Sequence, residues 1–198
     1  MNRSAFFLGL IACLGCSKPN LEVLHTLRPL SPDAAKSAPS EIPLALEIMP
    51  IRLPESVQRP QLVRETGPGT MSLWEAHRWA NGLDKDIQRI LVENLSLLAP
   101  TSSVVPYPQG ERVKAAHRLE VEVQRLAGQP NGTLTLQATW MLTPLQGGPA
   151  LRFRRVTLQA PVQGPDAEAM VAAHNRVLED LSRDIAAELG ALNLKEKP

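Results

Sequence analysis

The residues that could perform catalysis or bind a metal are few and widely spaced in this sequence. None of the histidines has a partner four residues away, the spacing that places two metal ligands on one face of a helix. The four histidines are His25, His77, His117 and His174. Two acidic pairs, Asp84 with Asp86 and Asp180 with Asp184, are expected on solvated helix faces rather than as acid/base pairs. No nucleophile elbow, phosphate-binding loop or dinucleotide fingerprint occurs. We therefore expect a non-enzymatic protein with no catalytic residue, no metal and no cofactor.

Both cysteines lie within the first sixteen residues, which read MNRSAFFLGLIACLGC. One arginine precedes a short apolar run, and this is the pattern of a secretory signal peptide. The run is too short to remain as a membrane-spanning helix. A small residue directly before a cysteine, followed by a polar chain, resembles the lipobox of bacterial lipoproteins, in which the signal is cut before a cysteine that becomes acylated.

Two cysteines compete for this role. Cys13 has the better residues before it but leaves a signal of only twelve, whereas Cys16 leaves a workable length and precedes the polar Ser17 and Lys18. We favour Cys16, with residues 1–16 as the signal peptide. The alternatives are an ordinary signal peptide cleaved elsewhere and an uncleaved anchor. Several acyl chains, at ~0.8 kcal/mol per buried methylene, would hold the protein on a membrane durably. With Cys16 acylated, the mature domain has no free thiol.

The composition of the chain excludes some classes of function. The chain has 21 basic and 20 acidic residues and a net charge of +1, so it has no electrostatic basis for binding nucleic acid. Residues 17–41 are rich in proline, serine and alanine and predict a tether, with a possible first strand over 24–29. As pure coil that stretch would span about 25–30 Å. Residues 42–194 predict a single domain.

Two amphipathic helices are predicted. The stronger signal runs from Leu83 to Leu98, where apolar residues recur every three or four positions and Pro100 ends the helix. The second begins near Asp166, after Pro165, and its apolar stripe reaches residue 192. His174 lies on that stripe and is expected in the core.

Alternating apolar and polar residues predict strands at 44–48, 119–124, 133–142 and 151–158, with shorter candidates at 61–65, 71–75 and 104–105. Residues 71–75 also fit a helical capping box, so both readings stay open there. The Asn131-Gly132 turn and a glycine-rich turn near residue 147 join three strands into an antiparallel meander with one solvated face. The predicted fold class is α+β, a two-layer sandwich in which a mostly antiparallel sheet carries two amphipathic helices on one face.

Aromatic and basic residues supply the candidates for partner contacts. Trp79, Leu83 and Trp140 are expected in the core. Arg78 could contact a partner or stack beside Trp79, and Trp74 is an interface candidate if it is exposed. Three arginines share one strand, which is either an edge protected by charge or a docking surface for an acidic partner or lipid headgroups: Arg152, Arg154 and Arg155.

The order and spacing of several segments resemble the family of ABC-type transport auxiliary lipoproteins. After the lipoprotein start come LHTLRP, LPESVQRPQLVRE, HRWANGL, ILVENLS, RLEVEVQRL, LQATWML and MVAAHNRVLEDLSRDIAAEL. No single segment is specific, but together they cover nearly the whole chain. The proline-rich segment before residue 44 is longer than is usual for that family. Its members include the lipoprotein subunit of the Pqi intermembrane transport system.

This resemblance implies a periplasmic lipoprotein subunit anchored to the inner leaflet of the outer membrane. Its expected partners are an MCE-domain protein and the ABC-type system to which that protein belongs. The chain would dock or line the MCE tube, as a homo-oligomer, in intermembrane lipid transport. Ser17 after the favoured cysteine agrees with outer-membrane sorting. The alternative is a monomeric periplasmic lipoprotein that binds a lipid or small molecule in a cavity between sheet and helices.

Overall fold

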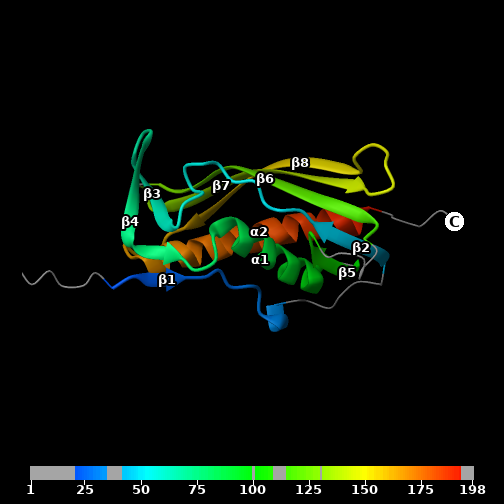
Figure 1. Ribbon diagram of the computed structural model, residues 1–198, viewed down its shortest axis with the longest axis horizontal. Coiled ribbons are helices and arrows are strands. Elements are labelled where there is room, and N and C mark those ends of the chain that lie inside the picture. The colour runs from blue at the N-terminus through cyan, green and yellow to red at the C-terminus, as the bar shows by residue number, and fades with distance from the viewer. Residues whose placement is uncertain (1–20, 35–41, 100, 109–114, 130, 193–198) are drawn as a thin grey trace, which may run out of the picture.

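A computed structural model describes residues 21–34, 42–99, 101–108, 115–129 and 131–192 (Figure 1). The predicted signal peptide with Cys13 and Cys16, together with residues 17–20 and 35–41 of the predicted tether, lies outside the described residues. The strands are β1 (Val23–His25), β2 (Ile42–Ile48), β3 (Gln61–Gly67), β4 (Thr70–Trp79), β5 (Thr101–Pro106), β6 (His117–Gly128), β7 (Thr133–Pro144) and β8 (Arg152–Pro161). A short 3-10 turn, η1 (Pro32–Ala34), and two helices, α1 (Leu83–Leu98) and α2 (Ala167–Ala191), complete the described elements.

Strand β6 organises the sheet. One edge pairs with β7 along almost its whole length, and β7 pairs in turn with the edge strand β8. Its other edge is shared, because β2 occupies the end at residues 117–119 and β3 meets the opposite end at Gly128. A single bridge from Arg52 to Glu122 lies between them. The sheet therefore continues in two directions from β6, through β2 to β5 and through β3 and β4 to β1.

The prediction of a mostly antiparallel sheet is wrong, although the α+β class is confirmed. The meander of β6, β7 and β8 and the β3–β4 hairpin are antiparallel, but the other four pairings are parallel: β1–β4, β2–β5, β2–β6 and β3–β6. Alternation of apolar residues identifies a strand but does not reveal its direction relative to a distant partner. The sheet is mixed, because β1, β2 and β5 join it through long connections.

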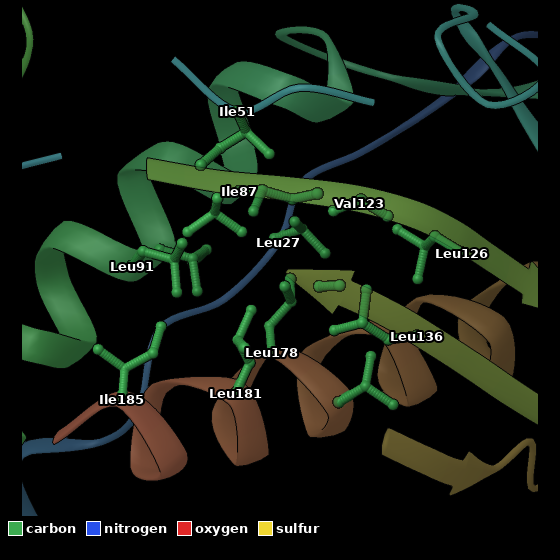
Figure 2. Close-up of a cluster of buried hydrophobic side chains, with 14 of the residues drawn as sticks. Leu27, Ile51, Ile87, Leu91, Val123, Leu126, Leu136, Leu178, Leu181 and Ile185 are labelled. Atoms are coloured by element: carbon green, nitrogen blue, oxygen red, sulfur yellow. The ribbon is translucent and has the colours of Figure 1, made fainter. Parts of the chain in front are cut away.

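Both helices lie beneath the meander and pack side by side (Figure 1). α1 has the bounds that the periodicity predicted, and α2 begins after Asp166, whose side chain accepts a hydrogen bond from the Ala169 amide. The inner faces of β6 and β7 meet both helices in one apolar core. Figure 2 shows side chains of that core, with Leu27 of the N-terminal segment inserted between the two helices. The residues after β1 are thus part of the packed domain.

The segment before α1 is a strand and not a helix. Residues 70–79 form β4, so the capping-box reading of Ser72 and Glu75 is wrong. The chain then turns through Gly82, whose φ of 81° is in the left-handed region that glycine tolerates best. This turn brings the end of β4 directly to the first turn of α1, so residues near Trp79 and Asp86 lie close to β1.

Candidate functional site

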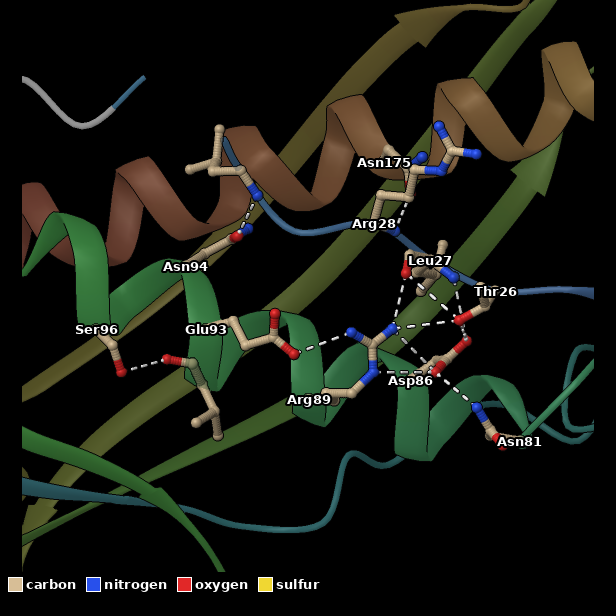
Figure 3. A network of polar contacts seen from close by, with 12 residues as sticks. Thr26, Leu27, Arg28, Asn81, Asp86, Arg89, Glu93, Asn94, Ser96 and Asn175 are labelled. Atoms are coloured by element: carbon tan, nitrogen blue, oxygen red, sulfur yellow. Dashed lines mark hydrogen bonds and ion pairs between the residues drawn. The ribbon is translucent and has the colours of Figure 1, made fainter. Parts of the chain in front are cut away.

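The N-terminal segment after β1 is held by side chains of both helices (Figure 3). The Asp86 carboxylate on α1 accepts hydrogen bonds from the Leu27 amide and the Thr26 hydroxyl, each at 3.1 Å. Arg89, one turn later, donates to the Leu27 carbonyl at 2.7 Å and forms an ion pair with Asp86 at 3.2 Å. Asp86 is only 1% exposed. The expectation that it lies on a solvated helix face is therefore wrong.

Two asparagines continue this attachment toward the end of the helix pair. Asn175 on α2 accepts from the Arg28 amide at 3.0 Å, and Asn94 on α1 accepts from the Leu30 amide at 2.8 Å. Asn94 also donates to the Ser182 hydroxyl on α2 at 3.0 Å. Because these backbone amides have no strand partner, the side chains replace the sheet hydrogen bonds that they lack. The segment that follows the predicted lipid anchor is thereby fixed across both helices.

The residues predicted to lie in the core do so. Trp79, Leu83 and Trp140 are all buried. The Trp79 and His174 rings form a T-shaped contact with centroids 5.2 Å apart, and the Trp140 indole donates to Asp184 at 3.1 Å. His174 is buried as expected. Burial lowers its pKa to about 4, although the hydrogen bond to the Met170 carbonyl acts in the opposite direction.

The first two interface candidates lie on β4. Trp74 is half-buried, with the Arg64 guanidinium 5.1 Å from its ring centre, an arrangement that favours a cation–π contact. Arg78 forms an ion pair with Glu22 at 2.8 Å and so helps attach the start of β1. Both residues already have partners within the chain.

The basic strand divides into two faces. Arg152 and Arg154 point toward α2, where Arg152 pairs with Glu188 at 3.0 Å and Arg154 pairs with Asp184 at 3.2 Å and also with Glu188. Arg155 lies on the opposite, exposed face of β8 beside Phe153, which is 62% exposed. Asp184 thus forms an ion pair with Arg154 and accepts a hydrogen bond from the Trp140 indole. The expectation that Asp184 lies on a solvated helix face is therefore wrong. The three arginines do not form one basic surface.

The contact between His25 and His77 was not predicted from the sequence. His25 Nε2 and His77 Nδ1 are 2.8 Å apart, and the rings are stacked with centroids 5.1 Å apart. Glu168, in the first turn of α2, lies beside them. His77 follows His25 by 52 positions, and Glu168 follows His77 by 91 positions. The parallel β1–β4 pairing and the position of α2 bring the three residues together. No local spacing could have indicated this cluster.

The hollows found in the described part are at its surface. One of about 370 Å³ lies at the end of the sheet and is lined by Arg64, Trp74, Val162 and Met170, among others. A second, of about 340 Å³, lies between β1 and α2 and includes His25 and Glu168. None of the helices in the described ranges is long and apolar enough to cross a membrane.

Comparison with solved structures shows the fold. A crystal structure of an uncharacterised protein superposes with a TM-score of 0.69 at 21% identity, covering 85% of this chain and 99% of that one. A crystal structure of a Xanthomonas campestris protein of family DUF330 superposes with a TM-score of 0.68 at 15% identity, covering 84% and 93%. No curated protein matches the sequence.

The family follows from the sequence itself. Residues 25–186 match the family described as the ABC-type transport auxiliary lipoprotein component. The matched range begins at His25, the last residue of β1, and ends within α2, so it contains strands β2 to β8, all of α1 and most of α2. The chain belongs to the family of ABC-type transport auxiliary lipoproteins.

Proposed function

We propose that the protein is a non-enzymatic lipoprotein subunit of an ABC/MCE-type intermembrane lipid transport system. It is acylated at Cys16, lies in the periplasm on the inner leaflet of the outer membrane, and docks an MCE-domain tube there as a homo-oligomer. The observation that carries this proposal is the family match over residues 25–186. The position of both cysteines before the described domain supports the anchor.

The attachment of the N-terminal segment supports a short distance between membrane and domain. Val23 is already in the sheet, and only six residues separate it from Cys16. A fully extended chain gains at most about 3.5 Å per residue, so the start of β1 lies within about 25 Å of an acylated Cys16. The β1 end of the molecule would then face the membrane, and the opposite end would point into the periplasm.

The outer face of β8 is the best candidate for the docking surface. Phe153 and Arg155 are exposed on this edge strand, whereas Arg152 and Arg154 are paired with α2. An exposed aromatic residue beside an arginine is a composition that protein interfaces favour. We assign the predicted docking role of the basic strand to this face.

The test uses the lipidated chain purified in detergent, with its mass measured by light scattering alone and with an MCE-domain protein of the same organism. We expect a higher oligomer that binds the MCE protein. The double variant Phe153→Ser, Arg155→Glu should bind the MCE protein at least tenfold more weakly. The control Thr157→Ser, on the same exposed face, should bind it as the unchanged chain does. A monomer that does not bind the MCE protein would overturn the proposal.

One observation favours a second function, a monomeric lipoprotein that binds a lipid or small molecule. The hollow of about 370 Å³ combines Trp74, Val162 and Met170 with Arg64, a mixture of apolar and polar groups typical of ligand sites. A monomer that copurifies with phospholipid, detected by mass spectrometry and lost in Trp74→Ala, would support this function instead.

A further inference from the structure

We propose that His25, His77 and Glu168 form a binding site for a divalent transition metal ion, with Zn²⁺ as the best fit. The three residues come from three elements: β1, β4 and the first turn of α2. Each offers one ligand atom, and all of these atoms lie within 4.8 Å of one another. Two imidazoles and one carboxylate are the donor set of many zinc sites that keep a fourth position open.

The distance between the two rings suits a shared cation. His25 Nε2 and His77 Nδ1 face each other at 2.8 Å, so one of them must offer a lone pair to the other. At Zn–N distances of about 2.0–2.1 Å, two tetrahedral nitrogen ligands lie about 3.3 Å apart. Opening the pair by about half an ångström, with both rings turned toward Glu168, would let both lone pairs face one ion in place of the shared proton.

The charges of the three ligands suit a cation. Each imidazole must offer an unprotonated nitrogen to the ion. The Glu168 carboxylate supplies one negative charge to a site that would otherwise hold only neutral ligands.

The cluster also leaves room for a further ligand. His25 is 9% exposed, and with Glu168 it lines the hollow of about 340 Å³ between β1 and α2. Leu24, Thr26, Arg28 and Asn175 also line that hollow. A water molecule can therefore complete a four-coordinate ion from this side.

Metal binding here would attach the first strand to the second helix. β1 has three residues and pairs only with β4 among the described strands, so it has few sheet hydrogen bonds of its own. An ion held by β1, β4 and α2 would add a direct connection at the end of the domain that follows the predicted lipid anchor. Because the ion binds the folded chain only, it raises stability by mass action.

The first experiment needs no substitution. The full chain, isotopically labelled in histidine, purified in detergent and stripped with chelator, is titrated with ZnCl₂ and observed by NMR of the histidine rings. We expect the His25 and His77 signals to change with one equivalent of Zn²⁺, while those of His117 and His174 stay in place. Zn²⁺ that leaves the His25 and His77 signals unchanged would overturn the proposal.

The second experiment compares variants by calorimetric titration with the same metal. His77→Gln and Glu168→Gln should each weaken Zn²⁺ binding at least tenfold, the loss that even an outer-shell change produces. The matched control is His117→Gln, a partly buried histidine on β6 outside the cluster. The N-terminal residues are the same in every variant, so any Zn²⁺ that they bind cancels in the comparison. Equal affinity in all variants would show that the metal binds elsewhere and would refute the site.

Discussion

At the scale of single residues, the buried carboxylate of Asp86 decides how the chain enters its domain. It lies in the first turn of α1, where the helix dipole already favours a negative charge. It also satisfies the Leu27 amide and the Thr26 hydroxyl, and it faces Arg89. A buried charge of this kind is tolerated because several donors surround it. Its loss should therefore cost more than the loss of any one contact.

We predict that Asp86→Ala lowers the free energy of unfolding by about 2–3 kcal/mol, because the Leu27 amide is left buried without an acceptor. Asp86→Asn keeps the shape and one oxygen and should cost about 1 kcal/mol. Urea unfolding of the purified chain measures both. The control is Glu93→Gln, which removes the exposed partner of Arg89 and should change stability by less than about 0.5 kcal/mol. A loss in Asp86→Ala no larger than in this control would contradict the argument.

His174 makes stability depend on pH. Burial lowers its pKa to about 4 in the folded chain, from an ordinary value of 6.5. Between pH 6.5 and pH 4 the unfolded chain therefore binds a proton at His174 that the folded chain does not bind. The contribution of the neutral His174 to the free energy of unfolding is fully present above pH 6.5 and decreases as the pH falls toward 4. At 1.36 kcal/mol per pKa unit, the decrease is roughly 3 kcal/mol.

His174→Gln should remove this part of the pH dependence. The measurement is the free energy of unfolding at pH 7 and at pH 4.5 for both proteins. The pKa values of His25 and His117 are also lowered, the first cause in each case being burial, but both residues remain in the variant. The difference between the two proteins thus isolates His174. Parallel pH curves would show that His174 is not the cause.

At the scale of elements, a polar contact inside the core joins the two helices. Ser182 donates to the Leu178 carbonyl within α2 and accepts from Asn94 of α1. Both Asn94 and Ser182 are buried. An asparagine in this position must keep its partners, since an unpaired amide in the core is costly. The pair therefore fixes the relative position of α1 and α2 where apolar packing alone would allow them to slide.

Ser182→Ala should destabilise the chain by about 1–2 kcal/mol, because the Asn94 amide loses its acceptor. Ser96 is the matched control, since it makes the same bond to the carbonyl four residues earlier but is exposed. Ser96→Ala should therefore be close to neutral. Chemical unfolding of the two variants, with Asn94→Ala and the double variant to complete a thermodynamic cycle, gives the coupling energy. A coupling near zero would remove the role assigned to this contact.

The elements also show which features of the fold can be predicted from the sequence and which cannot. Both helices and the β6–β8 meander were predictable because their signals are local: a stripe of apolar residues, an alternation, an Asn-Gly turn. The parallel pairing of β1 with β4 was not, since it joins segments about fifty residues apart. The Asp86 attachment and the His25–His77 pair depend on that pairing, so they were missed with it. Arg152 and Arg154 could not be assigned to α2 without knowing which face of β8 the helix covers.

At the scale of the whole molecule, the predicted anchor and the described domain meet at β1. The sequence carries a net charge of only +1, so electrostatic attraction to anionic lipids is weak. No helix among the described residues can span a bilayer. We expect durable association of this domain with a membrane to depend on the acylation proposed at Cys16.

We predict that Cys16→Ser abolishes incorporation of labelled fatty acid and releases the protein from washed membranes, whereas Cys13→Ser leaves both unchanged. Serine is close to cysteine in size, so we expect Cys13→Ser to keep the signal functional. The opposite pattern would move the anchor to Cys13, and labelling lost in neither variant would contradict acylation. If Cys16 is the anchor, its acyl chains hold β1 within about 25 Å of the bilayer, because only a few extended residues separate them. The attachment of residues 26–30 to both helices would then transmit that position to the entire domain.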